Sequence, residues 1–141
     1  MSVSSGFVRD RKKTVTKLII IGCGGFIGAL LRYGISGAIQ SASKSISFPY
    51  GTLGVNVIGC LFIGLLAYLV ETRSLIAPEI RMFLMVGLLG SLTTFSTFGN
   101  ETFELMRDSA FILAALNIAA QVLIGLTAVW CGRAIACAVW G

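Results

Sequence analysis

The chain has 141 residues, of which 56% are hydrophobic and only 12% charged, with a mean hydropathy of +0.91 and a formal net charge of +5. Soluble domains carry about a quarter charged residues, so this composition indicates a membrane protein. Histidine is absent and no nucleophile–base pair is visible, so we expect no enzyme activity. The positive charge is explained by anionic lipid headgroups and membrane topology, and we expect no nucleic-acid partner.

Four long apolar segments follow one another along the chain, at residues 17–39, 50–70, 80–106 and 110–140. A bilayer core of ~30 Å needs roughly 20 helical residues, and each segment is long enough. None alternates in the way that strands of a membrane barrel do. We therefore predict an all-α membrane protein with a basic, flexible tail at residues 1–16 and a single four-helix transmembrane domain at residues 17–141.

Basic residues bear on orientation, because cytoplasmic loops carry an excess of Lys and Arg. With both termini on one side, eight basic residues lie on that side and three on the other, counting Arg32 near the end of the first span. Without the tail through Lys13 the ratio falls to four against three. Such a near-neutral ratio is typical of chains that insert in both orientations, and the sequence leaves open whether the tail decides.

The first two spans carry polar or small residues that need an explanation inside a membrane. Gly24 and Gly28 form a G-x-x-x-G pattern, which is typical of close helix packing. Arg32 places a cation at the edge of the apolar slab, where it either draws anions or anchors at the headgroups. Asn56 lies about two turns inside the second span, which begins near Pro49. Its amide offers two donors and one acceptor, for another helix or for a solute.

The third span contains the unusual stretch GSLTTFSTFGNE, at residues 90–101. Gly87, Gly90 and the β-branched Thr93–Thr94 pair make this a weak place in a helix, so we predict an interruption near residues 90–95. An interrupted helix frees backbone carbonyls and amides, which are tolerated at membrane depth only where they line a cavity or bind an ion.

This stretch offers neutral donors and aromatic rings, and no fixed positive charge. Ring edges are electropositive, so Phe95 and Phe98 can present C–H edges to an anion. Stronger hydrogen bonds could come from the Asn56 amide and from hydroxyl groups, namely those of Ser91, Thr94, Ser96 or Thr97. A fixed Lys or Arg would hold the anion too firmly for conduction. The residues therefore favour a small-anion pathway. The alternative is a helix-packing surface in which Ser and Thr hydroxyls form hydrogen bonds between helices.

Three blocks of sequence resemble one known family. They are GGFIGALLRY in the first span, GTLGVN at the second, and GSLTTFSTF with a following Glu in the third. Together they are similar to the Fluc-type (CrcB) fluoride channels, and the resemblance covers roughly residues 17–135. It implies a passive, fluoride-selective channel that exports fluoride across the cytoplasmic membrane and confers fluoride resistance. It also implies an inverted, dual-topology homodimer with two pores.

The resemblance also implies roles for individual residues. Phe95 and Phe98 match the phenylalanines whose edges line the pores, and Asn56 matches the pore asparagine. Gly90 and Thr93 match the pair whose backbone carbonyls hold a central structural Na⁺, two from each subunit. Arg32 matches an arginine of the aqueous vestibule. The polar lining of the pore would comprise the neighbouring hydroxyls and an acid, namely Thr94, Ser96, Thr97 and Glu101.

Other readings stay open at this stage. Some family members have Tyr and Ser where this chain has Asn117 and Gln121, and the roles of these two residues stay open. Some members work as pairs of oppositely oriented homologues, so the partner is either a second copy or such a homologue. A small dual-topology exporter is disfavoured because it needs an ionisable group midway along a span, and the first span has no acid. A non-conducting scaffold subunit is the other alternative.

Overall fold

The computed structural model describes the backbone of residues 3–73 and 76–141, and the side chains of residues 13–72 and 76–141. The described chain is helical, with short connections. The helices in chain order are α1 (Val3–Ser43), α2 (Tyr50–Arg73), α3 (Pro78–Arg81), the π-helical η1 (Met82–Leu89), α4 (Gly90–Leu92), α5 (Phe95–Arg107) and α6 (Phe111–Trp140).

Four stretches of this chain are long and apolar enough to cross a membrane, which confirms the predicted fold class. They are Lys13–Ser43, Tyr50–Thr72, Pro78–Arg107 and Phe111–Trp140, and the third is made of four consecutive helical pieces. The first helix begins at Val3, so no helix end separates the expected tail from the first span. The protein is a multi-pass membrane protein.

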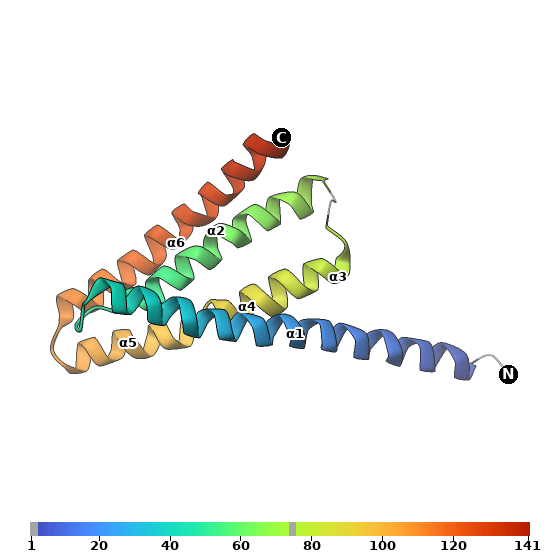
Figure 1. Ribbon diagram of the computed structural model, residues 1–141, viewed down its shortest axis with the longest axis horizontal. Coiled ribbons are helices and arrows are strands. Elements are labelled where there is room, and N and C mark those ends of the chain that lie inside the picture. The colour runs from blue at the N-terminus through green and yellow to red at the C-terminus, as the bar shows by residue number, and fades with distance from the viewer. Residues whose placement is uncertain (1–2, 74–75) are drawn as a thin grey trace.

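Figure 1 shows the helices arranged as two packed pairs that meet at one end of the molecule. Helix α2 packs along α6, and α1 packs along the third span. Glycines allow the backbones of α2 and α6 to approach closely: a Cβ at Gly64 would meet the Val129 carbonyl, and a Cβ at Gly132 would meet the Leu61 carbonyl. Such small-residue contacts are typical of helices packed inside membranes.

The predicted G-x-x-x-G pattern of α1 faces the π-helical part of the third span. A Cβ at Gly24 would lie 2.5 Å from the Phe83 carbonyl oxygen, and one at Gly28 would meet the Leu88 carbonyl. The wider π-helical turn therefore packs directly against the backbone of α1. Segments of π-helix are frequent beside functional sites, and here the segment leads into the break of the third span.

The buried core is small and lies where α2 meets the third span. Val55, Leu89 and Leu92 are 0%, 5% and 3% exposed. Most other large apolar side chains face outward, as expected for helices whose solvent is lipid. This buried cluster therefore lies at the edge of the break in the third span.

Candidate functional site

The break in the third span lies at Thr93 and Thr94, inside the predicted interval. Both residues are extended, with φ/ψ of −83°/155° at Thr93 and −150°/112° at Thr94. Helix α5 then starts at Phe95, with Thr94 as its N-cap: the Thr94 hydroxyl accepts from the Thr97 backbone N–H at 3.2 Å. Threonine suits this position because its oxygen satisfies an amide that has no helical partner.

The break also deprives backbone carbonyls of their helical donors, among them those of Gly90 and Thr93. In a continuous helix the carbonyl of Gly90 would accept from the Thr94 N–H, and that of Thr93 from the Thr97 N–H. Here the Thr94 N–H donates to Asn56 Oδ1 at 2.9 Å, and the Thr97 N–H donates to the Thr94 hydroxyl. Gly90 and Thr93 are the two residues for which sequence reasoning expects ion-binding carbonyls.

Asn56 holds the opened backbone from the side of α2. Its Oδ1 accepts from the Thr94 N–H, and its Nδ2 donates to the Thr94 carbonyl at 3.3 Å. Nδ2 also donates to Gln121 Oε1 of α6 at 3.1 Å. The sequence leaves another helix or a solute open as the partner of the Asn56 amide, and in this structure its Nδ2 group donates to oxygens of the break and of α6. Asn56 therefore joins α2, the break and α6.

A cavity of about 390 Å³ lies beside this junction. The rings of Phe95 and Phe98 line it, with their centroids 5.3 Å apart in an edge-to-face arrangement at 65°. Asn56 and Gln121 line it as well, together with the predicted cation-binding pair, Gly90 and Thr93. The structure thus brings together residues that the sequence places up to 65 positions apart.

The hydroxyls of the stretch lie at the start of α5. Thr94 is buried, and its Oγ1 is 2.9 Å from Thr97 Oγ1 and 3.3 Å from Ser96 Oγ. Ser96 and Thr97 are exposed on the outside of the single chain and do not line the cavity. Ser91 faces elsewhere, since its hydroxyl lies beside Gly25 of α1. Of the hydroxyl candidates, Thr94 is the one that borders the cavity.

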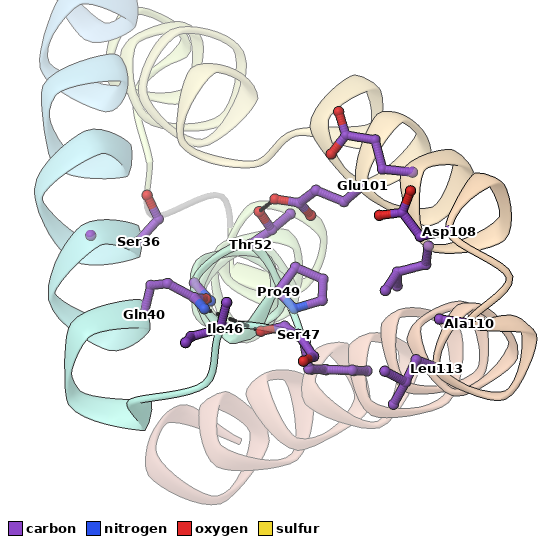
Figure 2. Close-up of a pocket in the computed structure, with 15 residues that line it drawn as sticks. Ser36, Gln40, Ile46, Ser47, Pro49, Thr52, Glu101, Asp108, Ala110 and Leu113 are labelled. Carbon is purple, nitrogen blue, oxygen red and sulfur yellow. Dashed lines mark hydrogen bonds between the residues drawn. The ribbon is translucent and has the colours of Figure 1, made fainter.

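Glu101 lines a second cavity, of about 660 Å³, at the end of the bundle where α1, α2 and α5 meet. Figure 2 shows Thr52 pointing toward Glu101, and the Thr52 hydroxyl donates to Glu101 Oε1 at 2.6 Å. Across the cavity Gln40 caps α2, because its Oε1 accepts from the Gly51 N–H at 2.9 Å. Asp108 also borders this space. Glu101 therefore borders this second cavity, which we call the mouth, and it does not border the cavity of Phe95 and Phe98.

Three buried polar atoms have no hydrogen-bond partner among the described residues: Glu101 Oε2, Asn117 Oδ1 and Gln121 Nε2. Asn117 is 0% exposed and donates through Nδ2 to Thr102 Oγ1 at 2.9 Å, while Thr102 donates to the Phe98 carbonyl at 2.8 Å. Buried polar groups are nearly always paired, so each exception calls for an explanation.

Sequence reasoning did not single out Thr52 or Thr102. Thr52 is one helical turn before Asn56, so the two share a face of α2, and this spacing was the available signal. Thr102 follows Glu101 and carries no comparable pattern. Arg32 lies partly buried on α1 and borders neither cavity.

Neither cavity is lined by Lys or Arg. The inner cavity combines aromatic edges with amide groups, and neutral groups of this kind can replace part of an anion's hydration shell without trapping it. Four spans, a third span broken in mid-membrane and a neutral polar cavity beside the break define a small multi-pass membrane protein with a built polar site.

Comparison with known proteins agrees with this class. Residues 19–133 match the family described as "CrcB-like protein, Camphor Resistance (CrcB)". The chain is 43% identical over 122 residues to fluoride-specific ion channel FluC 3 of Methanosarcina barkeri, which covers 86% of this chain and 91% of the relative. It is 46% identical over 116 residues to fluoride-specific ion channel FluC 1 of Methanosarcina acetivorans, covering 82% and 87%.

A bacterial relative is about as similar: fluoride-specific ion channel FluC of Elusimicrobium minutum is 45% identical over 116 residues, covering 82% of this chain and 90% of the relative. All four spans of this chain overlap the matched region. The chain therefore belongs to the CrcB family.

Proposed function

We propose that this protein is a fluoride-selective ion channel that lets fluoride leave the cell passively through the cytoplasmic membrane. One observation carries the proposal: two phenylalanine rings and two carboxamides line a single cavity at the break of the third span. The relatives that share most of the chain are named fluoride-specific ion channels. Family and geometry thus support the same function.

The lining of the inner cavity suits a small halide. The ring edges of Phe95 and Phe98 are electropositive, and carboxamide N–H groups donate strong hydrogen bonds to an anion. Because no Lys or Arg lines the cavity, an ion that enters can also leave. Passive conduction needs this balance between replacing water on entry and releasing the ion on exit.

We propose that the working unit is an inverted dimer, of two copies of this chain or of this chain and an oppositely oriented homologue. The outer surface of α5 supports a partner, because Ser96, Thr97 and Asn100 are exposed inside a membrane span. Polar groups facing lipid are costly, and a partner subunit would cover them. Phe95 is 82% exposed in the single chain and would be covered by the same contact, giving two pores per dimer.

A structural Na⁺ at the centre of this dimer is part of the proposal. A hard cation prefers oxygen ligands, and the carbonyls of Gly90 and Thr93 have lost their helical donors at the break. No group of three acidic, Cys or His side chains comes together as a metal site in the described part of the chain. We therefore propose the backbone oxygens as ligands, and the ion would take the place of their missing hydrogen-bond donors where two subunits meet.

The deciding experiment is efflux of fluoride from liposomes that contain the purified full-length protein, followed with a fluoride electrode. We expect rapid fluoride release from protein-containing liposomes and slow release from protein-free ones, with little chloride release in a parallel chloride measurement. Release of neither ion would favour a scaffold subunit. Release that requires a proton gradient would favour a coupled exporter.

A further inference from the structure

We infer that an anionic phospholipid binds in a groove between α1 and the start of the third span. The groove has a volume of about 810 Å³ and is lined by residues of α1, α3 and η1. Its outer edge is basic and would take the phosphate of the headgroup, and its inner part is apolar and would contact the acyl chains. None of its lining residues borders the two cavities described above.

The basic residues of this groove come from both helices. Lys13 and Lys17 are one turn apart and share a face of α1, and Arg81 at the end of α3 lines the opposite wall. All three residues are exposed, and none forms an ion pair with another described residue. Glu79 also lines the groove, so three cations share it with one carboxylate. The described side chains therefore leave the groove with a surplus of positive charge.

The inner part of the groove is apolar and narrow. Ile20 of α1 lines it, together with Met82 and Val86 of η1. One residue further along each helix the two backbones come close, because a Cβ at Gly87 would lie 2.6 Å from the Ile21 carbonyl oxygen. Figure 1 shows the third span diverging from α1 on the side of α3. The groove is thus a wedge, with a charged outer edge and an apolar inner end.

The position of the groove along the spans points to its occupant. The apolar segment of the first span begins at Lys17, and the third span begins at Pro78. The basic edge therefore lies where the hydrocarbon core gives way to headgroups. Basic pockets between membrane helices bind anionic headgroups, as they do in other membrane proteins. A phospholipid such as phosphatidylglycerol matches both parts of the wedge, whereas a soluble phosphate matches only its outer edge.

The alternative is that these basic residues only orient the chain during insertion, since Lys and Arg near span ends bias topology. That role needs charge but no groove, and it predicts no saturable lipid binding. A built site predicts saturable binding that prefers anionic to zwitterionic lipid. It also predicts opposite effects of Arg81 and Glu79, because one attracts and the other repels the same phosphate.

Native mass spectrometry of the purified full-length protein, titrated in detergent with phosphatidylglycerol or phosphatidylcholine, measures the binding. We expect saturable binding of phosphatidylglycerol, roughly fivefold or more tighter than that of phosphatidylcholine. The double substitution Lys17→Gln with Arg81→Gln should weaken phosphatidylglycerol binding about 25-fold, from about fivefold for each basic residue. Glu79→Gln should strengthen it, and this variant carries the test alone if K17Q/R81Q does not assemble.

The matched control is Lys44→Gln with Arg107→Gln. It removes one lysine and one arginine from the other ends of the same two spans, and neither residue lines the groove. Phosphatidylglycerol binding should equal that of the wild type in this control.

Three results would overturn the inference: equal binding by the wild type and K17Q/R81Q, weaker or unchanged binding by E79Q, or a loss in the control as large as in K17Q/R81Q. Displacement of phosphatidylglycerol by inorganic phosphate in large molar excess would also overturn it, because the groove would then hold a soluble anion. None of these measurements uses fluoride, so failure here leaves the proposed channel function standing.

Discussion

Two polar clusters connect the same helices and have opposite hydrogen-bonding character. The central cluster is Asn56, Thr94 and Gln121; the outer cluster is Thr52, Glu101, Thr102 and Asn117. The central cluster ends on a spare donor, Gln121 Nε2, and the outer cluster ends on spare acceptors, Glu101 Oε2 and Asn117 Oδ1. A donor stabilises an anion and an acceptor does not, so we propose that the anion is selected at the central cluster.

The difference arises from the backbone. The central cluster is organised by a broken helix, whose exposed peptide group imposes the orientation of two side-chain amides. The outer cluster is organised by intact helices, in which the peptide groups are already paired and side chains bond one another. Breaking the third span therefore creates an oriented donor that unbroken helices at the mouth do not provide.

The largest effect is expected from the aromatic rings of the inner cavity. Phe98→Ile, and separately Phe95→Ile, removes an electropositive edge and keeps an apolar side chain, so fluoride efflux should fall to the level of protein-free liposomes. The oligomer should still form, because isoleucine keeps an apolar side chain at either position. A fluoride electrode and size-exclusion chromatography measure the two outcomes. Unchanged efflux in both variants would refute the ring-edge role.

The central cluster should be nearly as sensitive. Asn56→Asp keeps an oxygen for the Thr94 N–H but removes the donor to the Thr94 carbonyl and to Gln121, and it adds negative charge facing the anion. We expect fluoride efflux to drop about 100-fold or more, since the lost hydrogen bonds and the repulsion act together. The same electrode assay applies, and retained conduction would remove Asn56 from the ion path.

A smaller effect, of opposite sign, is expected at the outer cluster. Glu101→Gln retains an oxygen that can accept from Thr52 and removes a negative charge at the mouth. Repulsion between two like charges 4 Å apart in bulk water is about 1 kcal/mol, so fluoride efflux should rise about fivefold or less. Initial efflux rates at low ionic strength measure this. A slower rate would mean that the carboxylate assists the ion, which would reverse the comparison between the two clusters.

The smallest effect is expected at the far ends of α2 and α6. Glu71 and Arg133 form an exposed ion pair there, at 2.7 Å between Oε2 and Nη2. Exposed pairs contribute little, so Glu71→Gln should leave both efflux and the melting temperature of the detergent-solubilised protein unchanged. A clear loss of melting temperature would show that the α2–α6 packing depends on this pair.

Much of the architecture was predictable from sequence, for identifiable reasons. Four apolar segments set the spans, and the Gly-rich, β-branched stretch at residues 87–94 set the break. The sequence pattern and the family resemblance also predicted that Asn56 and the two phenylalanines belong to one site. The sequence alone could not show which buried donors and acceptors are paired within the protein and which are left unpaired. That depends on the register of α2 against α6, which puts Gln121 within 3.1 Å of Asn56 and leaves one donor free.

The central claim is that neutral donors and ring edges at a broken membrane helix conduct fluoride selectively and passively. The most direct measurement is the reversal potential of the current through the reconstituted protein in a planar bilayer. With a tenfold fluoride gradient and equal chloride, we predict reversal at about 59 mV, the fluoride equilibrium potential, and no shift when a chloride gradient is added. Reversal at the chloride equilibrium potential, or no current with either halide, would contradict the account.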